Sequence, residues 1–391
     1  MNLLKLSWKN LWYKPQSTLF TILIIAIGLA AILFISNLSN YLKKEFENNI
    51  NGIDMVLGAK GSPLQLILSA VFQIDTPIGN IPLSAAEKIS SNRWVKKTIP
   101  ISFGDSYKGI RIVGTDTSYI YHYNGKLNHG KLWTNDMEVV LGEQVAKKLS
   151  LNVNDEFFSA HGLQTEGMAH DESPYKVVGI LNTSQSVMDN LILTSTESIW
   201  HVHGGHEPTE PEITAMLVTF SSPMGLVRIP AAINKGTSMQ AALPSFEINK
   251  LFSMLGIGFE LFYSLGVVLL LVAATSLWIN ISLSLQDRSY ELAFMRAQGA
   301  SRIYTMISLI MESVWLSILG FTAGLLLATG STYIFNGQLI DEYGYNLPLF
   351  QYNDIHLKLF VSTILLALIA SIFPIIRTIR RDISTTLSES K

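Results

Sequence analysis

Cysteine is absent from the 391 residues of this chain, which excludes disulfides and thiolate metal sites and leaves His, Asp and Glu as metal ligands. Charge is also scarce, since charged residues make up 15% of the chain and the net charge is −2. This balance argues against a nucleic-acid-binding protein. The sequence has neither the Gly-x-x-x-x-Gly-Lys-Ser/Thr loop that holds ATP phosphates nor a Gly-x-Ser-x-Gly nucleophile motif. We therefore expect no catalysis by the chain itself.

Apolar residues are abundant, at 48% with a mean hydropathy of +0.31, and indicate a chain that is part membrane and part globular. Four segments reach the roughly 20 apolar residues that a membrane helix needs; they are residues 17–38, 259–285, 303–335 and 357–376. The first follows three lysines but is too long for a signal-peptide core, so we interpret it as a retained anchor.

The placement of lysine and arginine predicts the orientation of these spans. Basic residues cluster before the first span (Lys5, Lys9, Lys14), between the second and third (Arg288, Arg296, Arg302), and after the fourth (Arg377, Arg380, Arg381). The loop 336–356 carries only acidic charges. We therefore expect an amphipathic helix at 1–16, the loop 286–302 and the tail 377–391 to be cytoplasmic, so that both termini are cytoplasmic. The loop 336–356 and the large segment 39–258 would lie outside.

The segment 39–258 has the pattern of a mixed α/β domain. Its strand candidates are Ile53–Leu57, Ile110–Gly114, Glu138–Leu141, Tyr175–Ile180, Leu191–Thr194 and Ile213–Phe220. Its helix candidates are Ser84–Ser90, Gly142–Leu149 and Pro223–Asn234. Ser84 and Glu87 have the spacing of a capping box, which predicts Ser84 as the N-cap.

Apolar residues at helical spacing extend the first two spans beyond the apolar runs. They are Tyr41, Leu42, Phe46 and Ile50 after the first span, and Ile248, Leu251, Phe252 and Leu255 before the second. Two such helices would form a stalk under the outer domain; the alternative is that they are only interfacial flanks. The segment Gly58–Pro82 is less regular, and its apolar residues could pack under a lid or touch lipid.

The stretch Gln286–Arg302, QDRSYELAFMRAQGASR, interrupts the apolar runs with a short helical pattern. Glu291 and Met295 are four residues apart, as are Leu292 and Arg296, and Gly299 stands where a helix would end. A helix with one apolar and one charged edge between two spans is a surface for another protein to bind. The alternative is a solvated, positively charged loop.

Four stretches resemble a known family. They are LSWKNLWYKPQSTLFTILIIAIG; IRIVGTD with VVLGEQVAKKLSLNVNDEF and YKVVGIL; DRSYELAFMRAQGAS; and Glu312 with GFTAG and PIIRTIRRD. Together they resemble the four-span permeases of the macrolide-exporter (MacB), FtsX and lipoprotein-release (LolC/LolE-like) superfamily of bacterial ABC systems. The third stretch is the most specific, since charge order, spacing and position between spans agree.

The resemblance implies an α-helical four-span permease of the bacterial inner membrane with a large extracytoplasmic mixed α/β domain on stalk helices. It implies a separate ABC ATPase subunit, so that ATP acts only through that partner, and a homodimer or a pair of related permeases. Arg288, Glu291, Leu292, Met295, Arg296 and Gly299 would form the ATPase contact. Hydrolysis would move the outer domain to export or extract a substrate. A periplasmic protein or lipoprotein and membrane lipids are further expected partners.

Glu312 lies within the third span, where an ionisable group is costly unless it faces protein or water. We expect it to pair with polar groups at a helix interface; the alternative is an ion or proton site. Gly320 and Gly324 form a small-xxx-small face suited to close helix packing, for which a dimer seam is one location.

Histidines cluster in the outer segment, and imidazole with carboxylate but no thiolate suits Zn²⁺. The candidate ligands are His201, His203 and His206 in HVHGGHE, and His161 and His170 in HGLQTEGMAHDE. On a strand, His201 and His203 would point the same way. We expect weak zinc binding or sensing, against the alternative of a polar surface loop.

Two other functions remain open at this point. As in the cell-division branch of the superfamily, the permease could activate a periplasmic hydrolase without moving a substrate. A sensor subunit of a two-component system would have no ATPase partner.

Overall fold

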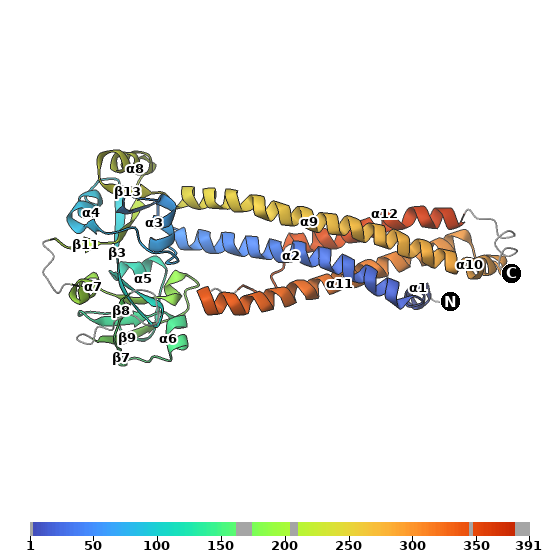
Figure 1. Ribbon diagram of the computed structural model, residues 1–391, viewed down its shortest axis with the longest axis horizontal. Helices are drawn as coiled ribbons and strands as arrows, with labels where there is room; N and C mark the ends of the chain where they lie inside the picture. The colour runs from blue at the N-terminus through green and yellow to red at the C-terminus, as the bar shows by residue number, and fades with distance from the viewer. Residues whose placement is uncertain (1–2, 162–173, 204–209, 344–346, 380–391) are drawn as a thin grey trace. The chain divides into compact units, whose positions relative to one another are not determined.

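The computed structural model describes residues 3–161, 174–203, 210–343 and 347–379, and it divides into two compact units (Figure 1). Unit 1 comprises Met1–Tyr41 and Leu255–Lys391, and unit 2 comprises Leu42–Met254. Both boundaries fall inside a helix, because α2 (Pro15–Ile50) and α9 (Pro244–Asp287) each supply residues to both units. The predicted helical extension of the first two spans is thus confirmed.

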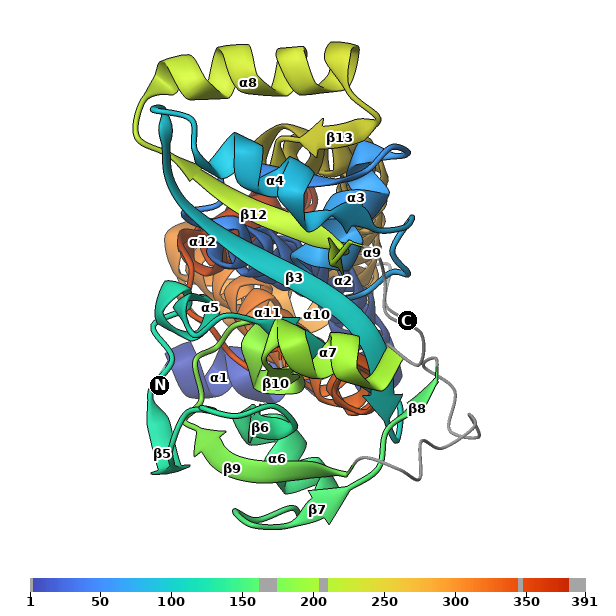
Figure 2. The same cartoon turned by 90° about the vertical axis from the view of Figure 1, so that its left-hand side faces the viewer.

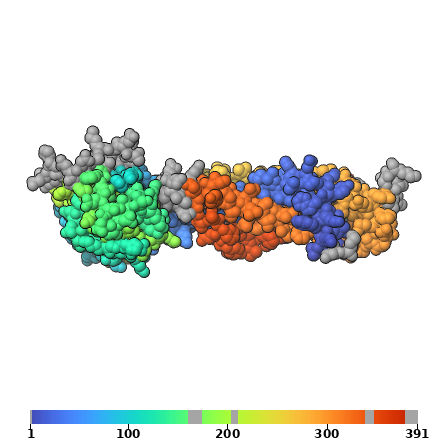
Figure 3. Space-filling view, turned by 90° about the horizontal axis from the view of Figure 1, so that it is seen from below, coloured from blue at the N-terminus to red at the C-terminus, as the bar shows by residue number. Residues whose placement is uncertain are grey.

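Unit 1 is helical in its described residues. Besides its parts of α2 and α9, it contains α1 (Leu3–Leu11), α10 (Ser289–Ala297), α11 (Arg302–Tyr343) and α12 (Asp354–Ile379). Four of these helices, α2, α9, α11 and α12, are long and apolar enough to cross a membrane, which agrees with the predicted four-span class. In the space-filling view, the first residues of the chain (blue) lie on the surface against α11 (orange) (Figure 3).

The small residues of α11 permit close packing inside unit 1. A Cβ added at Gly320 would lie 2.5 Å from the Ile25 side chain, and one at Gly324 would lie 2.9 Å from the Leu29 side chain. Both partners belong to α2 of the same chain. The small-xxx-small face therefore serves packing within the protomer, and the suggested dimer seam was the wrong location for it.

Unit 2 is built on a sheet of eleven described strands, with the order β13-β1-β12-β3-β4-β10-β6-β9-β5 and with β7 on β9 and β8 on β3. Its strands are β1 (Met55–Ala59), β3 (Val95–Tyr107), β4 (Ile110–Thr115), β5 (Leu127–Gly130), β6 (Glu138–Leu141), β7 (Glu156–Phe157), β8 (Ala160–His161), β9 (Tyr175–Leu181), β10 (Ile192–Thr194), β12 (Ala215–Phe220) and β13 (Met239–Ala242). The pairs β4–β10 and β6–β9 are parallel and the other pairs are antiparallel. A separate two-stranded sheet pairs β2 (Ile81–Pro82) with β11 (Glu212–Ile213).

Helices cover both faces of this sheet. They are α3 (Pro63–Ala70), α4 (Leu83–Ser90), α5 (Ser118–His122), α6 (Glu143–Leu149), the 3₁₀ turn η1 (Val187–Asn190), α7 (Thr196–His203) and α8 (Pro223–Gly236). Figure 2 shows α7 beside β3 and α8 beside β13, and α7 also contacts β4. Because side chains alternate along a strand, β1 sends Met55 and Leu57 into one core and Val56 into the opposite one. The central strands of the sheet are therefore buried on both faces.

The segment Gly58–Pro82 is part of the core of unit 2. Leu66, Ile67 and Phe72, from α3 and the turn after it, are fully or almost fully buried in the largest cluster. The buried Arg111 donates to the carbonyl oxygen of Asp75 at 2.9 Å and thereby fastens the returning loop to β4. These contacts place apolar residues of the segment in the core of unit 2, whereas the sequence left open whether they pack under a lid or touch lipid.

The C-terminal end of α2 and the N-terminal end of α9 also belong to this core. Phe46 and Ile50 of α2 and Leu251 and Phe252 of α9 pack against the same cluster. The ring centroids of Phe46 and Phe252 are 5.5 Å apart. Within unit 2, the two helices are thus joined to each other and to the sheet by apolar contacts.

Two local predictions were wrong. Helix α4 begins at Leu83 after Pro82, so Ser84 is no N-cap, and its hydroxyl instead hydrogen-bonds Glu210. Residues His201 and His203 lie in helix α7 and not in a strand.

Candidate coupling site

The short helix α10 follows α9 after one residue, Arg288, and ends in a defined C-cap. The amide of Gly299 donates to Arg296 O and that of Ala300 to Met295 O, while Gly299 has φ +100°. This pair of hydrogen bonds is the Schellman motif, which needs a residue that tolerates positive φ. Gly299 therefore ends the helix where the sequence predicted.

The two faces of α10 differ sharply. Leu292 and Ala293 are buried against unit 1, whereas Glu291 and the aromatic residues Tyr290 and Phe294 are exposed. The two rings stack with centroids 6.4 Å apart. We call Tyr290, Glu291 and Phe294 the coupling face. The sequence analysis did not identify Tyr290 and Phe294 as part of this face. Their spacing of four residues on a charged helix could have indicated that the two rings lie side by side.

Arg288 lies inside the protein and not on this face. Only 6% of Arg288 and 7% of Glu312 is exposed, and Arg288 Nη1 donates to Glu312 Oε1 at 3.1 Å. The same carboxylate oxygen accepts from Asn10 Nδ2 at 2.8 Å. Arg288 Nε also donates to the exposed Glu291 at 3.5 Å. The expected polar pairing of Glu312 is present, and it joins α1, α11 and the start of α10.

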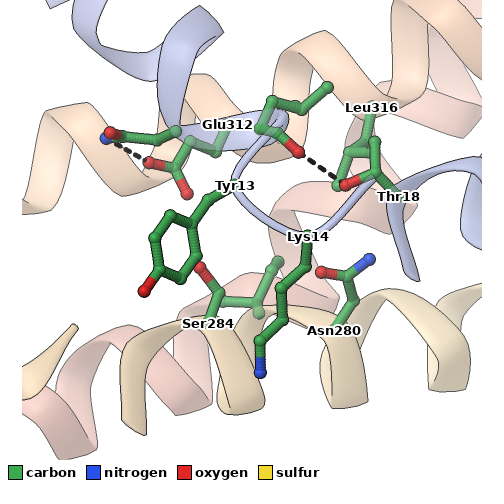
Figure 4. Close-up of a pocket in the computed structure, with 10 residues that line it drawn as sticks. Tyr13, Lys14, Thr18, Asn280, Ser284, Glu312 and Leu316 are labelled. Carbon is green, nitrogen blue, oxygen red and sulfur yellow. Dashed lines mark hydrogen bonds between the residues drawn. The ribbon is translucent and has the colours of Figure 1, made fainter. Parts of the chain in front are cut away.

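A second polar contact lies beside the first. Lys14, in the turn between α1 and α2, forms an ion pair with Asp287, the last residue of α9. Thr18 of α2 donates its hydroxyl to Leu11 O at 2.6 Å and so fixes the angle of the α1–α2 turn. Figure 4 shows Lys14, Asn280 and Glu312 among the residues that line a water-sized cavity of about 20 Å³.

The residues predicted for ATPase contact thus do not share one exposed surface. Glu291 and Gly299 are exposed, Met295 and Arg296 are half-buried, and Arg288 and Leu292 are buried. Asn10, Lys14 and Asp287 were missed because their partners are distant in sequence; Asn10 and Glu312 are 302 residues apart.

The predicted metal ligands are not brought together by the described part of the chain, in which no cluster of three His, Asp or Glu side chains forms. His201 is exposed on α7. His206 and His170 lie outside the described residues, as do the side chains of His161 and His203. Arg380 and Arg381 of the basic tail also lie outside them.

Comparison with known proteins finds two family matches that together cover most of the chain. Residues 18–243 match the MacB-like periplasmic core domain, and residues 263–383 match the FtsX-like permease C-terminal family. The pyoverdine export ATP-binding/permease protein PvdT of Pseudomonas fluorescens (strain Pf0-1) is 23% identical over 352 residues. That alignment covers 82% of this chain and 50% of PvdT, so the chain spans about half the length of this relative.

Two solved structures are similar to part of the chain. The periplasmic region of MacB from Actinobacillus actinomycetemcomitans has 15% identity and a TM-score of 0.36, covering 52% of this chain and 95% of its own. The extracellular domain of the noncanonic ABC-type transporter YknZ from Gram-positive bacteria has 13% identity and a TM-score of 0.32, covering 48% of this chain and 98% of its own.

Proposed function

Because the chain belongs to the family of ABC permeases with a MacB-like periplasmic core domain and an FtsX-like C-terminal region, we propose that it couples ATP hydrolysis by a separate ATPase subunit to movement of unit 2. It is a multi-pass protein of the inner membrane. In this proposal α10 faces the cytoplasm and unit 2 faces the opposite side, as the distribution of Lys and Arg predicts. The permease works as a homodimer or with a related permease, and it exports or extracts a substrate that unit 2 meets.

The observation that carries the proposal is the two-sided character of α10. Its inner face is buried in unit 1 while Tyr290, Glu291 and Phe294 are exposed together on a helix between two predicted spans. Stacked aromatic residues beside a carboxylate are typical of binding hot spots, in which aromatic anchors supply most of the affinity. A surface of this kind, immediately after α9, supports docking of the ATPase subunit.

The route from this surface to unit 2 follows the chain. Helix α9 ends one residue before α10 and begins at Pro244, among residues of unit 2. A displacement of α10 therefore acts directly on a helix that is packed into the core of unit 2 through Leu251 and Phe252. This continuity supports mechanical coupling as the mode of action.

The test is copurification of the ATPase subunit from native membranes. We expect the amount of copurified ATPase subunit to fall by at least about tenfold in the double variant Tyr290→Ala, Phe294→Ala, and separately in Glu291→Lys. The reason is that central anchors of an interface each contribute about 2 kcal/mol or more. Tyr333→Ala is the control, because Tyr333 is a tyrosine on α11 that is more exposed (71%) than Tyr290 (49%). A complex that survives both coupling-face variants would refute the proposed contact.

The same purification separates the alternatives. If the wild-type complex contains a cell-wall hydrolase and its ATPase responds to no soluble substrate, the chain is a regulator and not an exporter. If it contains no ATPase subunit at all, the proposed function fails outright.

Zinc binding is a second, independent proposal that rests on the histidines of the outer segment. Isothermal titration of the full chain with Zn²⁺ should show a site that disappears when His201, His203 and His206 are replaced by Ala. Unchanged binding in this variant would remove the idea. So would the absence of any binding tighter than about 10⁻⁵ M, which is the weak end of the range known for calcium-sensor sites.

A further inference from the structure

Helix α10 is connected by the chain to only one of the two helices that are shared with unit 2. Asp287 ends α9 and Ser289 begins α10, so any shift of α10 reaches α9 through a single residue. Helix α2 begins at Pro15, far away in sequence. If α2 is to move with α9, a non-covalent contact must join the first residues of α2 to the coupling helix.

The ion pair between Lys14 and Asp287 is such a contact. Lys14 immediately precedes α2, and Asp287 is the last residue of α9. The two side chains are 46% and 38% exposed, so neither is needed to fill a core. A half-exposed pair of this kind adds little stability, but it spans the two helix ends that must move together.

The buried contacts of Glu312 reinforce the same junction. Glu312 Oε1 accepts from Asn10 of α1 and from Arg288 at the start of α10. The turn from α1 into α2 is held by the hydrogen bond from Thr18 to the carbonyl oxygen of Leu11. The start of α10 is therefore fixed to α1, and α1 is fixed to the start of α2.

We propose that Lys14 and Asp287, supported by Asn10, Glu312 and Arg288, form a clamp that delivers the displacement of α10 to α2 as well as to α9. The inference rests on the proposed function, because it assumes that an ATPase subunit moves α10. Lys14 and Asp287 are positioning residues in it and need not touch the ATPase subunit. The clamp makes both helices shared with unit 2 respond to one input.

Charge reversal tests the clamp, since both members are accessible. The variants are Lys14→Glu, Asp287→Lys and the double reversal, each in the full chain purified with its ATPase subunit. The matched control is Lys43→Glu, which reverses one member of the exposed pair Lys43–Glu47 on α2.

The readout is amide hydrogen exchange with and without ATP plus vanadate, followed in residues 41–50 of α2 and residues 244–254 of α9. In the wild type and in the control, both segments should change exchange on nucleotide trapping. Each single reversal should reduce the change in the α2 segment by roughly two- to fivefold, the equilibrium effect that an exposed ion pair supplies, and leave the α9 segment unchanged. The double reversal should restore the α2 response, which a merely structural defect would not allow.

Three results would overturn the clamp. The α2 segment could respond normally in both single reversals, the double reversal could fail to restore it, or either single reversal could lose the ATPase subunit, which would assign the pair to the ATPase interface. Failure of the proposed function has a different signature, because the wild-type chain would then copurify with no ATPase subunit.

Discussion

Replacing Arg288 by methionine should destabilise unit 1 far more than the loss of a surface ion pair would. Arg288 and Glu312 are 6% and 7% exposed, and the guanidinium lies 3.1 Å from the carboxylate. Methionine retains an apolar stem but leaves Glu312 with the Asn10 amide as its remaining described donor. Removal of one partner from a buried pair costs about 3–5 kcal/mol, because the remaining charge is uncompensated.

A double replacement separates this electrostatic cost from lost packing. With Arg288→Met and Glu312→Leu together, no buried charge is left alone, and apolar substitutes for a buried pair are often neutral or even stabilising. We therefore expect most of the lost free energy of unfolding to return. Arg302→Met is the control, since Arg302 is exposed at the start of α11 and its replacement should change stability by no more than about 0.5 kcal/mol.

The assay is reversible denaturant unfolding of the full chain in mixed micelles. It compares the wild type, Arg288→Met, Glu312→Leu, the double replacement and the Arg302→Met control at the same micelle composition. The free energies of the wild type, Arg288→Met, Glu312→Leu and the double replacement form a double-mutant cycle for the Arg288–Glu312 pair. An interaction energy below about 0.5 kcal/mol, the range seen for independent sites, would refute the buried-pair reasoning. An Arg288→Met variant that is as stable as the Arg302→Met control would refute it as well.

Three further outcomes are expected for the same chain. Gly324→Leu should cost about 1–3 kcal/mol by overpacking against α2, whereas Gly330→Leu, where an added Cβ meets nothing within 4 Å, should be nearly silent in the same unfolding assay. Asn49→Ala should cost about 1–3 kcal/mol, because the buried amide of Val187, now 2.8 Å from Asn49 Oδ1, loses its acceptor; unfolding at constant pH measures this. Burial, with a smaller contribution from a nearby lysine, lowers the pKa of His122. As pH drops through about 6.5, the ordinary pKa of histidine, the His122 side chain therefore takes up a proton in the unfolded chain before it does so in the folded chain. The free energy of unfolding should fall with pH in this range, and the His122→Gln variant should show a weaker pH dependence.

The strands of unit 2 were predictable where a strand is buried on both faces and so forms a continuous apolar run. Glu138–Leu141 was predicted with the bounds that β6 has. The strand β3 was missed because Pro100 and the polar residues at both ends of its sequence obscure the pattern. Ser84 was misassigned because a local capping motif gave way to a hydrogen bond with Glu210, 126 residues away.

The coupling helix shows a different limit, because its charge pattern gives no sign of which charges are buried. Arg288 and Glu291 are three residues apart and would be neighbours on one continuous helix. Arg288, however, is the N-cap residue, with φ −100° and ψ 10°, outside the helical conformation of α10. This break between α9 and α10 turns the Arg288 side chain inward to Glu312 while Glu291 stays exposed. The interruption that begins α10 is therefore what allows one residue of the motif to anchor the helix and its neighbour to remain available to a partner.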